Sequence, residues 1–317
     1  MADTGANAWQ KVKKPAPGLP QSIGDYSAGC IQGAQSLALD GEGYQVMHPS
    51  RRRYFGHPYL VRFIQDLGRA VHTKGLGVIL VGDLSLPRGG RATGGHASHQ
   101  SGLDVDLWYW HPKRAELGPL SQDERERTKA QSVLDSKTST VKAKWSAYVI
   151  QMLRFTAEYP RVERVFVHPA IKRELCAQPF KQRAWMKKIR PWHGHDDHAH
   201  VRLACPEDSL ECTRQAPVPE GDGCQELDWW FNDTSSADRE IALKAYVSKV
   251  LREPKLPARC YQLLESAEPE GEKLKSGSET VAPLGQMSIE SSGGVNTSLA
   301  PAKIDKNDSP NESHFGR

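Results

Sequence analysis

The sequence lacks the long apolar runs and the strong charge bias of membrane-spanning or nucleic-acid-binding proteins. None of its apolar stretches reaches the roughly 18–20 residues that a membrane-spanning helix needs. The formal net charge of the 317 residues is only +4, and the basic residues are spread along the chain, whereas a nucleic-acid surface usually concentrates them in one stripe. We therefore expect no membrane span and no nucleic-acid partner. Nothing in the sequence indicates an oligomeric state.

Several common signatures of catalysis are also absent. There is no His-Glu-x-x-His pair, no Gly-x-Ser-x-Gly nucleophile elbow and no Cys-x-x-Cys pair. The first absence excludes a zinc peptidase whose ligands lie on one helix, and the second disfavours a serine hydrolase. No cysteine lies inside a histidine cluster, which argues against a cysteine nucleophile.

The N-terminus carries no apolar signal-peptide core, yet the cysteines point to an exported protein. They are dispersed and even in number: Cys30, Cys176, Cys205, Cys212, Cys224 and Cys260. This pattern fits three disulfides in an oxidising compartment, although six buried, reduced thiols in a cytosolic protein would give the same sequence. A mature exported protein whose leader is replaced by an initiator Met reconciles both observations.

Two short segments concentrate the residues that can bind metals. Residues 94–106 contain His96, His99, Asp104 and Asp106, and residues 193–200 contain four more histidines. Half of the twelve histidines therefore lie in these two segments. A single histidine is more often a hydrogen-bonded core residue than a ligand, but two clusters of this kind indicate a metal site.

The periodicity of apolar residues predicts an α+β fold. Apolar residues recur at three- and four-residue steps over 58–74 and again over 145–159, which predicts helices. Short alternating or apolar runs predict four strands, at 77–82, 103–110, 162–167 and 198–203. We expect a single domain, residues 1–265, in which helices and disulfide-pinned loops flank a small antiparallel sheet that carries the metal site. Residues 266–317 are poor in aromatics and rich in Ser, Glu, Lys, Gly and Pro, so we expect a disordered tail.

The strand pattern also predicts how the site is assembled. Alternate side chains of a strand share one face, so His198 and His200 point the same way, as do Asp104 and Asp106. If the two strands are neighbours, a carboxylate and the imidazole of His99 can face an imidazole from the second strand. Two nitrogens, one carboxylate oxygen and an open position describe a catalytic zinc site.

The same residues carry a resemblance to a known group of metallopeptidases. The stretch from Ser98 to Asp106 resembles the S-H-x-x-G-x-x-x-D motif of the lysostaphin, D-Ala-D-Ala metallopeptidase and Hedgehog group, and the stretch from His198 to His200 resembles its H-x-H motif. Within that group the sequence is similar to the penicillin-insensitive murein endopeptidase family. That likeness extends from about Trp9 to Cys260 and includes all six cysteines.

The resemblance implies a periplasmic zinc endopeptidase that cleaves peptide cross-links of peptidoglycan, chiefly the bond between D-alanine and meso-diaminopimelate. It assigns one zinc ion to three ligands, His99, Asp106 and His200. His198 becomes the catalytic histidine, while His195 and His96 match further active-site histidines. The implied disulfides are Cys30–Cys260, Cys176–Cys224 and Cys205–Cys212.

The sequence departs from the family pattern in two respects, and two other functions are considered beside the endopeptidase. Some family members use the outer histidine and a downstream Asp-His pair for a second metal, but no histidine occurs between His111 and His168. Only His96 and Asp135 could contribute to such a site here, so we expect His96 to support the first zinc and expect no second one. The tail is also longer than the family pattern. The first alternative is a D,D-carboxypeptidase acting on stem peptides, and those enzymes tend to carry a Glu before H-x-H, unlike this chain. The second is a catalytically silent, zinc-bearing cell-wall module, which the intact His198 disfavours.

Overall fold

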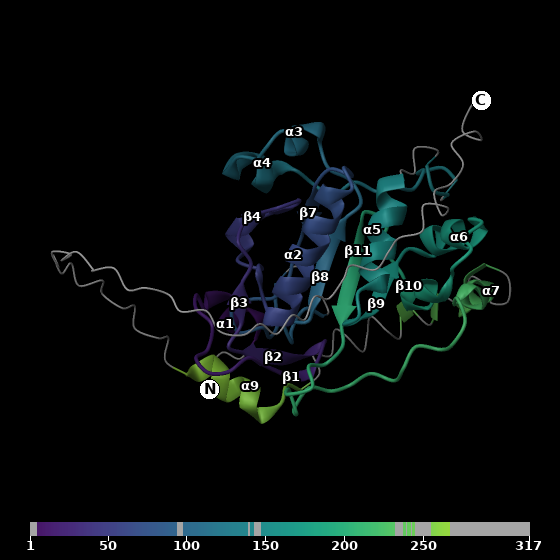
Figure 1. Cartoon of the computed structure of the whole chain (residues 1–317). Coiled ribbons are helices and arrows are strands. Elements are labelled where there is room, and N and C mark those ends of the chain that lie inside the picture. The colour runs from purple at the N-terminus through teal and green to yellow at the C-terminus, as the bar shows by residue number, and fades with distance from the viewer. Residues whose placement is uncertain are drawn as a thin grey trace, which may run out of the picture. The chain divides into compact units, whose positions relative to one another are not determined.

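A seven-stranded sheet forms the centre of the fold in the computed structural model (Figure 1). The structure describes residues 5–93, 98–138, 140–142, 147–231, 237–238, 240–241, 243–244 and 255–266. The strands are β1 (Gln21–Asp25), β2 (Ala28–Gln32), β3 (Gln35–Ser36), β4 (Asp40–Gly41), β5 (Tyr44–Val46), β6 (Phe55–Gly56), β7 (Ile79–Val81), β8 (Asp104–Trp108), β9 (Val162–Val167), β10 (Ile189–Pro191) and β11 (His198–Leu203). The main sheet has the order β10-β9-β11-β8-β7-β5-β4, and β1-β2 and β3-β6 form two small separate sheets.

The helices flank this sheet. They are α1 (Ala6–Lys11), α2 (Pro58–Thr73), α3 (Lys113–Glu116), α4 (Gln122–Arg127), α5 (Ala147–Glu158), α6 (Pro169–Ala177), α7 (Leu227–Phe231) and α9 (Ala258–Glu265), with single 3-10 turns at Pro49–Arg51, Ala184–Lys188 and Cys224–Glu226. In Figure 1, α2 and α5 run across one face of the central strands. Their apolar sides and the inward residues of β8 and β11, such as Val105 and Val201, belong to one buried cluster.

Helix α2 confirms the helix that the apolar periodicity predicts over residues 58–74. Its apolar residues form one buried stripe, which includes Leu60, Phe63 and Leu67. The side chain of His57 caps its first turn by accepting a hydrogen bond from the Tyr59 amide (3.2 Å), and Pro58 occupies the first helical turn, where a missing amide hydrogen costs nothing. The helix ends before Gly75, whose φ of 64° requires the left-handed region that glycine adopts most easily.

The expectation of a small antiparallel sheet was wrong, whereas a mixed α+β fold is confirmed. The sheet has seven strands and is mixed, because β10 pairs parallel with β9 and β5 pairs parallel with β7. β5 and β10 are only three residues long, too short for an alternating pattern to be distinguished from chance, so sequence periodicity does not reveal them. β10 ends in Pro191 at the edge of the sheet, the position where a strand tolerates proline.

Three disulfides staple the elements that lie outside the main sheet. Cys30–Cys260 joins β2 to α9, Cys176–Cys224 joins the end of α6 to the segment before α7, and Cys205–Cys212 closes a short loop after β11. These are the pairs that the family resemblance implied, so that prediction is confirmed. The alternative of six reduced thiols is excluded.

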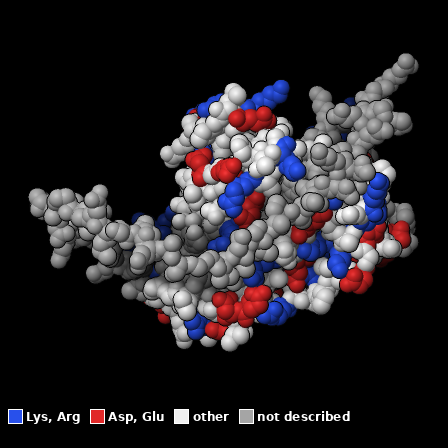
Figure 2. Space-filling view, in the orientation of Figure 1, with Lys and Arg blue, Asp and Glu red and all other residues white. Residues whose placement is uncertain are grey.

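The surface carries both signs of charge. On the face shown in Figure 2, Lys and Arg side chains alternate with Asp and Glu, and the described residues there form no broad surface of one sign. No helix in the described part of the chain combines the length and the apolar character needed to cross a membrane. The predicted tail, residues 266–317, lies outside the described residues except for Ser266, so its disorder stays a prediction.

Candidate metal centre

The two histidine segments come together on neighbouring strands. β8 and β11 pair antiparallel, and their register puts Asp106 opposite His200. The same register puts Asp104 opposite Arg202. Directly opposed residues share one face of a sheet, so all four side chains leave the face that points away from α2 and α5. The buried cluster on the other face fixes this orientation, because a register slip of one residue would turn the apolar side chains of the slipped strand away from that cluster.

Three potential metal ligands converge on this face. His99 Nε2 lies 3.3 Å from Asp106 Oδ1, and His200 Nδ1 lies 3.2 Å from the same oxygen. One donor atom from each residue lies within 4.8 Å of the others, and all three side chains are buried. Among the described residues, this is the one cluster of His, Cys, Asp or Glu with such spacing. The structure therefore brings together the three residues that the resemblance assigns as ligands.

The spacing and chemistry of these atoms fit a zinc ion. Zinc binds imidazole nitrogen and carboxylate oxygen at about 2.0–2.1 Å, so two ligand atoms of a tetrahedral site lie about 3.3 Å apart. The two nitrogen–oxygen distances, 3.3 and 3.2 Å, agree with that value. Two imidazoles and one carboxylate also leave a fourth position open, as in catalytic zinc sites.

Both aspartates of the site are ionised although they are buried. Burial alone would raise the pKa of Asp106, but the imidazoles of His99 and His198 outweigh it and hold the pKa well below its usual range. Burial likewise opposes ionisation of Asp104, and Arg202 again outweighs it and lowers the pKa. The site thus contains two buried carboxylates and one permanent cation, a balance that favours a bound cation.

Asp104 holds two of the candidate ligands in position. Its Oδ2 atom lies 3.4 Å from His200 Nε2, the ring nitrogen that faces away from Asp106. The same oxygen accepts a hydrogen bond from the His99 amide (3.1 Å). Arg202 clamps the carboxylate with two hydrogen bonds, from Nε (2.8 Å) and Nη2 (3.0 Å). A carboxylate on the outer nitrogen of a metal-binding histidine fixes the orientation of the ring.

His198 stands beside the three candidate ligands. Its Nε2 lies 3.6 Å from Asp106 Oδ1, and its Nδ1 lies 2.6 Å from the carboxylate of Asp197. Burial lowers the pKa of His198, but Asp106 and Asp197 together outweigh it and raise the pKa to about 9. One ring nitrogen is therefore held by Asp197 while the other faces the site. This role of Asp197 was not predicted from the sequence, because its place next to His198 in the chain does not reveal which way the His198 ring points.

His195 also reaches the site, whereas His96 lies outside the described residues. The ring of His195 lies 5.3 Å from that of His198 and 5.7 Å from that of His200. Burial, with help from these neighbours, lowers the pKa of His195 to about 3. Its Nδ1 lies 2.7 Å from the carbonyl oxygen of His193. Because a carbonyl only accepts, Nδ1 carries the proton of a neutral ring and Nε2 is an acceptor.

Backbone geometry contributes in ways that the sequence does not reveal. His99 and His195 have φ values of 67° and 58°, a region that residues other than glycine seldom adopt and that often marks functional sites. Gly82 lies against β8, where a Cβ atom would come within 3.1 Å of Asp106 Cβ. The Asp106 amide also donates to the carbonyl of Asp83 (3.1 Å). These contacts fix the position of the central carboxylate.

Comparison with known proteins gives a consistent result. Residues 22–265 match the model of a family described as penicillin-insensitive murein endopeptidase. A protein of that name from Klebsiella pneumoniae (strain 342) is 45% identical over 266 residues, which cover 82% of this chain and 92% of the relative. Proteins of the same name from Salmonella arizonae and Salmonella heidelberg are each 43% identical over 267 residues, covering 83% of this chain and 93% of each relative.

Proposed function

Because the chain belongs to the penicillin-insensitive murein endopeptidase family, we propose that it is a zinc enzyme that hydrolyses the D-alanyl–meso-diaminopimelyl cross-links of peptidoglycan. Membership in this family makes the chain a peptidase whose substrate is murein. The zinc and the particular bond are the proposed part. One observation carries it: the donor atoms of His99, Asp106 and His200 lie within 4.8 Å of one another, beside His198.

In this proposal the residues of β8 and β11 form the metal site. His99 Nε2, Asp106 Oδ1 and His200 Nδ1 would hold the ion, and Asp104 would orient His200 from behind. Zinc, when bound, supplies a Lewis acid that polarises a carbonyl group and lowers the pKa of water. Three protein ligands would leave a fourth coordination position for a water molecule or the substrate.

His198 would donate and accept protons during hydrolysis. Asp197 fixes its Nδ1, so Nε2 faces the reacting groups. That nitrogen can hydrogen-bond the negatively charged oxygen that develops on the carbonyl, and it can give its proton to the leaving amine. His195 stays neutral at physiological pH because its pKa is about 3, so its Nε2 can accept a hydrogen bond from a substrate N–H group.

We also propose that the protein acts in the periplasm, where its substrate lies. All six cysteines form disulfides, and disulfides persist in oxidising compartments such as the bacterial periplasm. The expected substrate is the cross-linked peptide portion of peptidoglycan.

Digestion of purified cross-linked muropeptide dimers tests the proposal. The protein should convert dimers to monomers, should bind about one zinc per chain and should lose activity with a chelator. Replacing His200 with Ala should abolish both zinc binding and hydrolysis, while His72→Ala, at a histidine with a 63% exposed side chain, should change neither. Intact dimers with shortened stems would identify a D,D-carboxypeptidase instead. Zinc binding without any product would identify a silent binding module.

A further inference from the structure

A cavity lies next to the turn that carries His195. Its volume is about 330 Å³, and its wall includes His168 and Pro169 at the start of α6, His193 and Gly194, and Trp230 and Phe231 of α7. None of these residues belongs to the three candidate ligands. The size is at the lower end of the range for small-molecule sites, about 300–1,000 Å³.

The cavity is largely aromatic. The rings of His193 and Trp230 meet edge to face at 4.8 Å, and Phe231 carries the guanidinium of Arg173 4.1 Å above its ring. The side chain of Phe231 is 38% exposed, so part of this ring is open to solvent. Exposed aromatic rings around a cavity indicate a surface that binds a flat, partly apolar ligand.

One turn connects the cavity to the site of hydrolysis. His193 lines the cavity, and its carbonyl holds Nδ1 of His195 at 2.7 Å. The carbonyl of His195 in turn accepts a hydrogen bond from the amide of His168 (3.0 Å), which also lines the cavity. A ligand in the cavity therefore lies within two residues of a histidine of the candidate active site.

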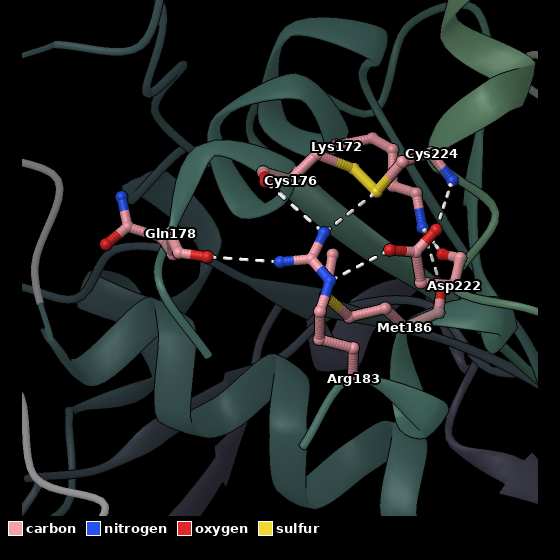
Figure 3. Close-up of a disulfide and its surroundings, with 7 residues drawn as sticks. All are labelled: Lys172, Cys176, Gln178, Arg183, Met186, Asp222 and Cys224. Atoms are coloured by element: carbon pink, nitrogen blue, oxygen red, sulfur yellow. Dashed lines mark hydrogen bonds and ion pairs between the residues drawn. A yellow bond between two sulfur atoms is a disulfide. The ribbon is translucent and has the colours of Figure 1, made fainter. Parts of the chain in front are cut away.

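The segment that leads into α7 is firmly anchored to α6, and Figure 3 shows the disulfide and the polar contacts that anchor it. The disulfide Cys176–Cys224 ties the end of α6 to the segment that leads into α7. The buried Lys172 Nζ donates to the carbonyl of Asp222 (2.6 Å), and Arg183 Nε pairs with the carboxylate of the same residue (2.8 Å). Because α7 starts directly after this anchor, Trp230 and Phe231 are held against α6. A preformed wall reduces the entropy lost when a ligand binds.

The charges around the cavity favour a neutral ligand. The carboxylate of Glu240 lines it, and Lys244 pairs with that carboxylate at 2.7 Å. The described lining residues include no Lys or Arg, and the two cations beside the wall, Arg173 and Lys244, are engaged with Phe231 and Glu240. A carboxylate of a peptide stem would therefore find no lining cation. Murein also contains neutral N-acetylated sugars, whose C–H faces pack on aromatic rings. Carboxylate and imidazole groups can accept hydrogen bonds from their hydroxyl and amide groups.

We propose that this cavity is a glycan subsite that binds an N-acetylated amino sugar of the strand attached to the cross-link. The proposal rests on the proposed function, since murein supplies the sugar. Trp230 provides the stacking surface, with Phe231 and His193 beside it, and Glu240 receives hydroxyl groups. The subsite would raise affinity for substrates that carry sugars without contributing to hydrolysis itself.

Binding of N,N′,N″-triacetylchitotriose to the chelator-treated full chain tests the subsite independently of hydrolysis. Titration followed by tryptophan fluorescence should show saturable binding, and Trp230→Ala should weaken it about tenfold or more. Leu117→Ala is the control, because this 84% exposed apolar residue does not line the cavity. No binding by the wild-type chain, or equal weakening by both variants, would overturn the proposal.

Kinetics separate the subsite from the active site. With cross-linked dimers that carry their disaccharides, Trp230→Ala should raise KM about tenfold or more and leave kcat unchanged. With the same cross-linked peptides freed of sugar, the variant and the wild type should have equal KM values. Equal effects on both substrates would overturn the subsite. Chitotriose binding with no hydrolysis of either substrate would instead overturn the proposed function.

Discussion

At the scale of single residues, the most consequential pair is Asp104 and Arg202. Asp104 is fully buried. Its Oδ2 atom contacts His200 and also accepts a hydrogen bond from the His99 amide. Arg202 is itself stacked 4.1 Å above the ring of Tyr26, which fixes the guanidinium. A buried ion pair costs desolvation and adds little net stability. Its retention beneath the site is better explained by the orientation that it imposes on the two histidines.

Asp104→Asn tests this role. The amide keeps the shape of the side chain but removes the charge that orients His200, so we expect zinc affinity to fall about 10- to 100-fold. Competition with a chelator at a temperature where the variant is folded measures this. Asp123→Asn, at an exposed residue paired with Arg127, is the control and should leave affinity unchanged. A variant with a lower melting temperature but normal zinc affinity would show that Asp104 serves stability alone.

His57, which caps α2, makes the stability of the fold depend on pH. Burial lowers the pKa of His57 to about 4, against an ordinary value of 6.5. Between these values the unfolded chain binds a proton that the folded chain does not, so the free energy of unfolding falls as the pH drops from 6.5 to 4, by up to about 3 kcal/mol. Asn caps a helix without titrating. In the presence of a chelator, urea unfolding should therefore show a smaller loss for His57→Asn over that range, and equal slopes would contradict it.

At the scale of elements, sequence periodicity identified the helices and strands whose pattern lies within one short segment of the chain. The helix at 58–74 and the strands at 162–167 and 198–203 correspond to α2, β9 and β11, because their apolar residues face a single core. Periodicity also put His198 and His200 on one face of a strand. It could not reveal β5 or β10, whose parallel partners are distant in sequence, nor the left-handed backbone of His99. These features depend on contacts formed only when the sheet is assembled.

The connection between β7 and β8 passes close to the site at Gly82, and a substitution there tests how tightly β8 is held. Gly82→Ala would put a Cβ atom 3.1 Å from Asp106 Cβ and 2.9 Å from Trp108 Nε1, so β8 would have to shift. We expect weaker zinc binding and lower activity, because the carboxylate moves away from both histidines. Gly68→Ala is the control: its Cβ would meet the Glu42 carbonyl oxygen at 2.5 Å and Tyr44 Cδ1 at 3.0 Å, away from the ligands. Both variants lowering zinc affinity equally would refute a specific effect of Gly82.

At the scale of the whole molecule, one disulfide connects the two ends of the described fold. Cys30–Cys260 spans 230 residues, whereas Cys205–Cys212 spans only 7. Arg88 adds to the longer connection, since its guanidinium donates to the carbonyl of Leu263 in the last turn of α9 and its Nε donates to that of Lys14. A cation at the carboxyl end of a helix satisfies carbonyls that lack intrahelical partners. The N-terminal hairpin and α9 are therefore held to each other by covalent and polar links.

The two disulfides should differ in their effect on stability. A cross-link stabilises a protein mainly by restricting the unfolded chain, and the restriction grows with the logarithm of the closed loop. For separations of 230 and 7 residues, this model gives a difference of about 3 kcal/mol. Replacing both Cys30 and Cys260 with Ala should therefore lower the free energy of unfolding by about that much more than replacing both Cys205 and Cys212. All four cysteines are buried, so losses from packing are similar. Urea unfolding of the chelator-treated double variants under oxidising conditions measures the difference. Equal losses would show that native-state packing, and not chain entropy, sets the contribution of these cross-links.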